Sequence, residues 1–195
     1  MIDRSGSGNT SLLNLAAGKT LEPTISEPRT PEEVAAFKTA MRHLAGAVAV
    51  ITTGSGEERT GFTATSVASF SMEPPTLIVC LNRASSSWPI IQNHGGFCVN
   101  LLSHDQSHIA DRFAGRGGVR GTGRYEGATW QQQPSGSLGL ADALVTIDCT
   151  LEEAIERHSH AILLGRVNAW RRAATPSRCS TGTVPTGCCQ ISIRC

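Results

Sequence analysis

The feature that most constrains the fold is a series of short apolar segments between Gly46 and Trp170, each bounded by glycine, proline or clustered polar residues. These β-type segments occupy residues 47–53, 76–81, 97–102, 143–151 and 161–170. Their lengths suit strands, and helices do not alternate regularly with them. We therefore expect a mainly β fold with short helices, in which an antiparallel sheet closes into a barrel, in preference to a doubly wound parallel sheet.

A helix is predicted before the first strand. Thr30 suits the N-cap, Pro31 the first helical position, and Glu33 the reciprocal position of a capping box. The apolar residues that follow are spaced to share one helical face, namely Val34, Phe37, Met41 and Leu44. This pattern predicts a helix over residues 31–44.

Two shorter helices and a long loop are predicted between the strands. Residues 85–93 begin with three serines followed by Trp-Pro, which is typical of a helix start. Ser103 and Gln106 form a second capping box that opens another short helix. Residues 115–140 are rich in glycine and glutamine and predict a long loop with Trp130 as its one large anchor.

The length of 195 residues predicts one domain with tails. Residues 1–29 predict a flexible N-terminal arm, residues 30–172 the folded domain, and residues 173–195 an atypical tail. The formal net charge of +1 provides no field that would attract nucleic acid or an anionic membrane. No segment suits a membrane span and the start lacks a secretory signal, so we expect a cytoplasmic protein.

Hydroxyl side chains gather in two segments that offer donors to a phosphate or a polar ring edge. Residues 60–71 predict one strand with a core-facing side and a hydroxyl-bearing side, which includes Thr63, Thr65, Ser66 and Ser69. Residues 85–87 place three serines at a helix N-terminus, where the dipole favours an anion. Neither segment carries a P-loop or Rossmann motif. The alternative is that serine and threonine simply suit strands and helix caps.

Cysteine and histidine patterns do not predict a metal site. The 7 cysteines include no C-x-x-C pair, and Cys80, Cys98 and Cys149 lie singly in apolar segments, where a thiol behaves as a small buried hydrophobe. His104 and His108 have the spacing of a metal-binding helix, but no third ligand accompanies them. We expect no metal. The alternative is a metal-binding protein that uses these two histidines and the cysteines of the tail.

Several motifs in order resemble one known family. GFTATSV at residues 61–67, PPTL at 74–77, CLNR at 80–83 and FCVNL at 97–101 are similar to segments of the short-chain flavin reductases. These enzymes are NADH:FMN oxidoreductases that serve two-component monooxygenases, such as those of 4-hydroxyphenylacetate hydroxylation and pyrimidine-ring oxygenation. The resemblance covers about residues 37–170. It implies a homodimeric, antiparallel split β-barrel of the Greek-key type that binds FMN near the dimer interface.

The resemblance also assigns roles to residues. It implies flavin contacts from a set that comprises Phe62, Thr63, Ala64, Thr65, Ser66, Asn82, Ser85, Ser86, Ser87, Asn100 and Leu101. Within this set, Asn82 and the three serines would hold the ribityl-phosphate arm. His160 matches the family's histidine near the nicotinamide and is the expected catalytic residue. The family has Gly-Asp-His or Gly-Thr-His there, whereas this chain has His158-Ser159-His160, so a glycine is missing.

The implied reaction explains why the sequence shows no nucleophile or acid–base pair. Hydride would pass directly from nicotinamide C4 to flavin N5, so the protein would need to stack two rings at about 3–3.5 Å and supply hydrogen-bond donors. The resemblance thus implies reduction of FMN or FAD by NADH or NADPH, followed by release of reduced flavin to a partner oxygenase. The alternative is a flavin-binding module with little or no turnover.

The tail departs from the family pattern. Members end in a strand with an aromatic residue and an Arg-x-Tyr element, whereas residues 176–195 contain no aromatic residue and four cysteines. We hypothesise a reading-frame change near residues 173–178, because G/C-rich codons for residues 177–189 can spell Leu-Leu-Asp-Arg-His-Arg-Ala-Tyr-Arg-Leu-Leu in a shifted frame. Such a product would lack its last strand, expose a sheet edge and bind nicotinamide poorly.

Overall fold

A computed structural model describes residues 30–173 and divides into two units after Met41. The first unit contains helix α1 (Pro31–Met41), whose predicted capping box is confirmed. The Thr30 N–H donates to Glu33 Oε2 at 2.9 Å, and the Glu33 N–H donates to Thr30 Oγ1 at 3.2 Å. The helix ends before Leu44, earlier than predicted, and none of its residues is buried in the described part of the chain. The predicted arm, and the tail with its proposed frame change, lie outside the described residues apart from residue 173.

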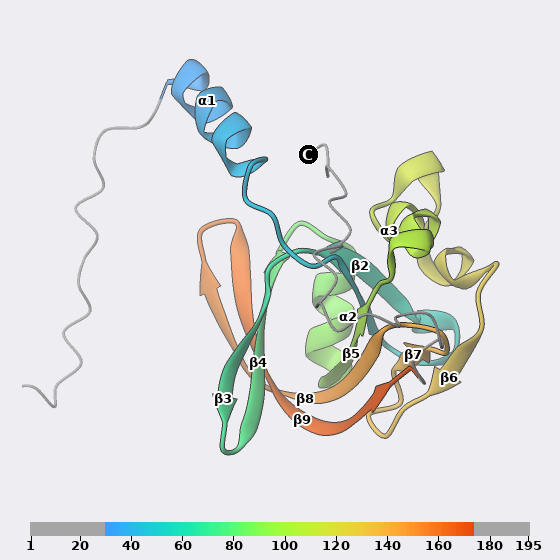
Figure 1. Cartoon of the computed structure of the whole chain (residues 1–195). Coiled ribbons are helices and arrows are strands. Elements are labelled where there is room, and N and C mark those ends of the chain that lie inside the picture. Colours follow the sequence, from blue (N-terminus) through green and yellow to red (C-terminus); the bar gives the residue numbers. More distant parts are fainter. Residues whose placement is uncertain (1–29, 174–195) are drawn as a thin grey trace, which may run out of the picture. The chain divides into compact units, whose positions relative to one another are not determined.

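The second unit is built around a seven-stranded antiparallel sheet with the strand order β2-β1-β5-β8-β9-β4-β3 (Figure 1). The strands are β1 (Ala49–Thr53), β2 (Thr60–Ala64), β3 (Val67–Met72), β4 (Pro75–Asn82), β5 (Gly96–Leu101), β8 (Val145–Arg157) and β9 (His160–Arg172). A small separate sheet pairs β6 (Trp130–Gln132) with β7 (Leu138–Leu140). The β8–β9 hairpin fills the space between β5 and β4. With the short helices α2 (Ser87–His94) and α3 (Ser107–Phe113), this architecture confirms the predicted mainly β, split-barrel class.

The sheet is not closed, which corrects the expectation of a closed barrel. Strands β2 and β3 are the two ends of the ladder, yet only Thr65 and Ser66 separate them along the chain. The connection from Ala64 to Val67 spans at most about 11 Å, so the sheet curls until its ends approach each other. The single strand predicted over residues 60–71 is two strands, because β2 bonds to β1 whereas β3 bonds to β4.

Two hydrophobic cores pack on opposite faces of β1. The first fills the inside of the curled sheet and includes Ile51, Phe97 and Leu163, which are fully buried. The second lies between the sheet and α3 and includes Val50 and Phe113. Alternate side chains of β1 therefore enter different cores, and every residue of that strand is buried. Each large apolar side chain buried in this way contributes about 1.5–3 kcal/mol to stability.

The segment predicted as a long loop has more than one anchor. It contains a short helical turn at Gly121–Tyr125 and the β6–β7 hairpin. The Tyr125 hydroxyl donates to the Thr60 carbonyl at 2.6 Å, and the Trp130 Nε1 donates to the Tyr125 carbonyl at 2.8 Å. Tyr125 is thus a second buried anchor beside Trp130. The glycine-rich composition of residues 115–140 gave no indication that Tyr125 is buried.

The predicted capping box at the third helix is confirmed, since Ser103 and Gln106 make both of its reciprocal interactions. Helix α3 follows it directly and buries Ile109, Ala110 and Phe113. Among residues 30–173, no helix is long and apolar enough to cross a membrane.

Candidate functional site

The end of strand β4 brings together two of the predicted site residues. Asn82 lies directly opposite His160 on β9, and His160 lies opposite Arg157 on β8. Leu81 and Ala161, the next residues along their strands, are buried in the core. Since side chains alternate along a strand, the three polar side chains share the outer face of the sheet and are exposed. We call Asn82, His160 and Arg157 the polar row.

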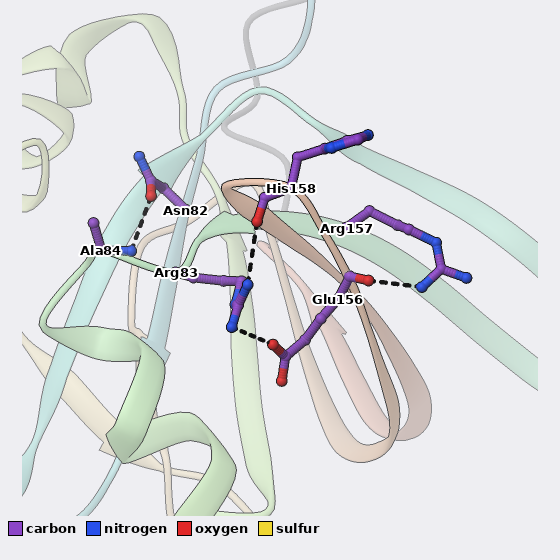
Figure 2. Close-up of polar contacts among 6 residues, drawn as sticks. All are labelled: Asn82, Arg83, Ala84, Glu156, Arg157 and His158. Carbon is purple, nitrogen blue, oxygen red and sulfur yellow. Dashed lines mark hydrogen bonds and ion pairs between the residues drawn. The ribbon is translucent and has the colours of Figure 1, made fainter. Parts of the chain in front are cut away.

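The junction of β2 and β3 is fixed beside the polar row. The Ser66 hydroxyl donates to the Cys80 carbonyl at 3.3 Å and accepts from the Cys80 N–H at 3.2 Å. This side chain therefore takes the place of a backbone pair just beyond the β3–β4 ladder. Thr65 is exposed beside it, with no hydrogen-bond partner among the described residues. Asn82 Oδ1 accepts from the Ala84 N–H at 2.9 Å, which shapes the turn that leaves β4 (Figure 2).

The three serines before α2 have different surroundings. Ser87 is fully buried, and its hydroxyl donates to the Gly61 carbonyl at 3.1 Å. Ser85 Oγ accepts from the Ser87 N–H at 3.2 Å. Ser86, at the N-cap of α2, is exposed, and its hydroxyl makes no capping bond. Of the three, Ser86 is the exposed serine at the helix N-terminus, where the helix dipole favours negative charge.

Arg83 contacts the β8–β9 turn at three points, a role that the sequence did not predict. Its backbone N–H donates to the Ser159 carbonyl at 2.9 Å, and one guanidinium nitrogen donates to the His158 carbonyl at 3.1 Å. The other terminal nitrogen forms an ion pair with Glu156 at 2.5 Å (Figure 2). Arg83 stands in a motif that carries the family resemblance, but only the strand register reveals that Glu156 lies beside it.

The predicted residues of β2 lie apart from the polar row. Phe62 and Ala64 are buried in the first core. Thr63 points to the opposite face of the strand, and its hydroxyl donates to the Ala110 carbonyl of α3 at 2.5 Å. Both faces of β2 are therefore covered, so the expected hydroxyl-bearing side is occupied by α3.

Asn100 and Leu101 lie on β5, in the sheet interior. Asn100 is fully buried; its side-chain amide donates to the Val50 carbonyl at 3.0 Å and accepts from the Leu140 N–H at 2.6 Å. Leu101 is half-buried and packs against the first core, opposite Ala49 of β1. The Asn100 side chain bridges β1 and β7 and has a structural role in this fold.

The buried thiols and the paired histidines lie outside the candidate site. Burial, together with the negative charge of Asp148, raises the pKa of Cys149 to about 12 and raises the pKa of Cys98 as well. Such thiols stay protonated and unreactive near neutral pH. The predicted burial is confirmed for Cys98 and Cys149, whereas Cys80 is only half-buried. His104 and His108 are exposed. Over residues 30–173, no group of three histidine, cysteine, aspartate or glutamate side chains could hold a metal ion.

Comparison with known proteins shows the family. Residues 41–178 match the family described as "Flavin reductase like domain". The chain belongs to this flavin reductase family. It is similar to the FMN reductase (NADH) RutF of Methylorubrum extorquens, with 43% identity over 142 residues that cover 71% of this chain and 67% of the relative. As a member of the family, the chain is an oxidoreductase of the flavin reductase kind, as the motifs predicted.

Solved structures of similar proteins share the fold. One is a homologue of nitrilotriacetate monooxygenase component B from Mycobacterium thermoresistibile, with a TM-score of 0.67 and 29% identity over 76% of this chain and 80% of that chain. Another is BorF, the flavin reductase component of a bacterial two-component tryptophan halogenase, with a TM-score of 0.66 and 27% identity over 71% of this chain and 87% of that chain. These likenesses confirm the split-barrel prediction.

Proposed function

We propose that this chain reduces FMN with NADH, and that hydride passes from nicotinamide C4 to flavin N5 on the outer face of the sheet at the end of β4. The observation that carries the proposal is the strand register, which sets Asn82 directly opposite His160. The residue that the resemblance assigns to the flavin and the residue that it assigns to the nicotinamide are thereby neighbours. Stacking two rings is a positioning task, so neighbouring binding residues are what the reaction requires.

The donors around the polar row fit a flavin with a phosphate arm. Thr65 and Ser86 are exposed hydroxyls, and the NH₂ group of Asn82 has no partner among the described residues. We propose that these three groups contact the flavin directly. The N-terminus of α2 would favour the phosphate end. Neutral donors of this kind bind less tightly than a cluster of charges, which suits a flavin that must leave after reduction.

The other assigned residues act through the fold in this proposal. Ser66 holds the β2–β3 junction against Cys80, and Ser85 and Ser87 shape the start of α2. The buried or half-buried members of the set support the strands that carry the site, namely Phe62, Thr63, Ala64, Asn100 and Leu101. FAD and NADPH remain alternative substrates within the same proposal, since no residue of the polar row distinguishes them.

His160 is proposed to orient the nicotinamide. Its Nδ1 lies 2.9 Å from the Ser159 hydroxyl, which restrains the imidazole ring, and its side chain is exposed beside Asn82. The Nε2 of the ring is left to face a bound nucleotide. This role asks for a hydrogen bond and a flat surface.

A second copy of the chain is proposed to cover the outer sheet face beside the site. Two rows of apolar side chains lie on that face and belong to neither core. One row crosses β3, β4 and β9 and consists of Ala68, Ile78 and Leu164. The other crosses β4, β9 and β8 and consists of Cys80, Ile162 and Ile155. Most of these side chains are half-exposed, and Phe70 nearby is 64% exposed. An apolar face of this kind marks an interaction surface. A homodimer formed there would place the polar row at its boundary.

The reduced flavin is proposed to pass to a separate oxygenase, because BorF, a similar protein, is named as the reductase component of a two-component system. A cytoplasmic location fits the free thiols of Cys80, Cys98 and Cys149. The test is NADH oxidation followed at 340 nm with and without added FMN. FMN-dependent oxidation supports the proposal. FMN binding without oxidation would favour the flavin-binding module instead, and no binding at all would contradict both.

A further inference from the structure

The turn that carries His160 is a two-residue hairpin connection with an unusual backbone. Arg157 pairs with His160 across the ladder, so only His158 and Ser159 connect β8 to β9. His158 has a φ of 51°, and among residues 30–173 it is the one residue other than glycine with a positive φ. Two-residue hairpins favour glycine at such a position, because a side chain with a Cβ is strained there. The turn therefore needs support from outside itself.

Arg83 supplies that support from the end of β4. Its backbone N–H and its side chain hold the carbonyls of both turn residues, at 2.9 Å for Ser159 and 3.1 Å for His158. The ion pair with Glu156 then fixes the guanidinium against β8 (Figure 2). An exposed ion pair alone stabilises little. Here the Arg83 side chain contacts both the strained backbone at His158 and Glu156 of β8.

We propose that Arg83 is a positioning residue for His160: it holds the β8–β9 turn in the left-handed conformation of His158 and thereby sets the direction of the His160 side chain toward the nicotinamide. The inference rests on the proposed function for the role of His160. Its structural half, that Arg83 restrains the turn, stands on the contacts alone. Arg83 itself touches neither ring in this account.

The test combines Arg83→Ala with His158→Gly. We expect Arg83→Ala to raise the KM for NADH about fivefold or more, the size expected for about 1 kcal/mol of lost orientation, while the Kd for FMN changes less than about twofold. Glycine adopts the left-handed conformation without strain, so adding His158→Gly should return the KM to within about twofold of the wild-type value. Arg166→Ala is the matched control, because it removes an exposed ion pair between β9 and β8 away from the turn, that with Glu152 at 3.2 Å.

The effect of adding His158→Gly to Arg83→Ala distinguishes a positioning role of Arg83 from a direct contact between Arg83 and the nucleotide. If Arg83 bound a nucleotide phosphate itself, glycine at position 158 could not replace it, and the double variant would stay as impaired as Arg83→Ala. That result would overturn the proposal. An equal effect of Arg166→Ala would overturn it too, because the effect would then be one of general strand stability.

Amide hydrogen exchange in the ligand-free protein tests the restraint of the turn by Arg83 separately from the proposed reduction of FMN. We expect amide hydrogen exchange over residues 157–161 to be about tenfold faster in Arg83→Ala, because local opening controls exchange, and His158→Gly to reverse this change. Unchanged exchange would overturn the inference even if NADH oxidation is observed. Faster exchange in a protein that fails to oxidise NADH would leave Arg83 restraining the turn and would refute the proposed function alone.

Discussion

Asn82 and Asn100 are the same residue type near the ends of two strands, and the fold gives them opposite surroundings. Asn100 is 0% exposed, and its side chain both donates to and accepts from buried backbone groups. Asn82 is exposed; its carbonyl oxygen accepts from Ala84, and its NH₂ group has no partner in the described part of the chain. A polar residue in a strand can bind a ligand only when the fold leaves some of its hydrogen-bonding capacity unused.

The same contrast holds elsewhere in the two regions. Asp148 is buried and accepts from the Ser135 N–H at 3.0 Å, the Ser135 hydroxyl at 2.5 Å and the Asn168 amide at 3.0 Å. These bonds tie a loop and the bulge of β9 at Asn168 to β8, where the register shifts between Asp148 and Cys149. By contrast, the donors at the end of β4 face solvent. The interior polar groups stabilise the fold, and the exposed ones are left for binding.

The largest expected effect separates the two asparagines. Asn100→Ala leaves the Leu140 N–H unpaired in the core and removes the side-chain bond to the Val50 carbonyl, so we expect a loss of about 3 kcal/mol in the free energy of unfolding. Asn82→Ala should cost less than about 1 kcal/mol, because its one bond is exposed, but it should weaken FMN binding. Urea unfolding and flavin fluorescence titration measure the two quantities. If Asn100→Ala kept its stability and lost FMN binding, the assignment of the two regions would be reversed.

The next effect tests the polar row on activity. His160→Ala should raise the KM for NADH about tenfold, equivalent to about 1.4 kcal/mol, with little change in unfolding free energy because His160 is exposed. His108→Ala, an exposed histidine on α3, is the control and should leave NADH oxidation unaltered. Equal kinetics for His160→Ala and the wild type would remove this residue from the site.

A smaller effect concerns charge beside the flavin. Ser66→Asp should weaken FMN binding about fivefold, because a carboxylate at the β2–β3 junction repels the flavin phosphate. Ser69→Asp adds the same charge to an exposed position of β3 and serves as the control. Fluorescence titration at two salt concentrations checks the cause, since screening should reduce the difference. Unchanged affinity in Ser66→Asp would show that the phosphate lies elsewhere.

The smallest effect concerns the interior alone. The pKa of Cys149 rises to about 12 in the folded protein, so folding retains a proton that the unfolded chain loses above about pH 9. Stability from this group is therefore present below pH 9 and is lost as the pH rises toward 12. Between pH 8 and pH 9.5 the unfolding free energy of the wild type should fall further than that of Cys149→Ala. We expect the two decreases to differ by about 1 kcal/mol. Equal losses in urea unfolding would contradict the burial argument.

Much of the fold could be predicted from local patterns. Capping boxes at Thr30 and Ser103 depend on residues three apart, and apolar strands such as 97–102 follow from composition and length. The break at Thr65 and Ser66 could not be predicted. It depends on which strands pair with residues 60–64 and 67–72, and that choice is made by contacts distant in sequence.

The candidate site was predicted only in part, because it too depends on contacts between residues that are distant in sequence. Sequence motifs indicated Asn82 and His160, and the register places them side by side. The motifs could not separate Asn82 from Asn100, because burial is a property of the whole sheet. Nor could they pair Arg83 with Glu156, which lies on a strand far along the chain.

The proposed flavin position is tested most directly by a crystal structure of the protein with excess FMN. We expect flavin density on the outer face of the sheet at the end of β4, in contact with Thr65, Asn82 and Ser86 and open toward His160. Flavin density beside Thr63 under α3 or around Asn100 would contradict it, as would an empty outer face in crystals where FMN is bound elsewhere.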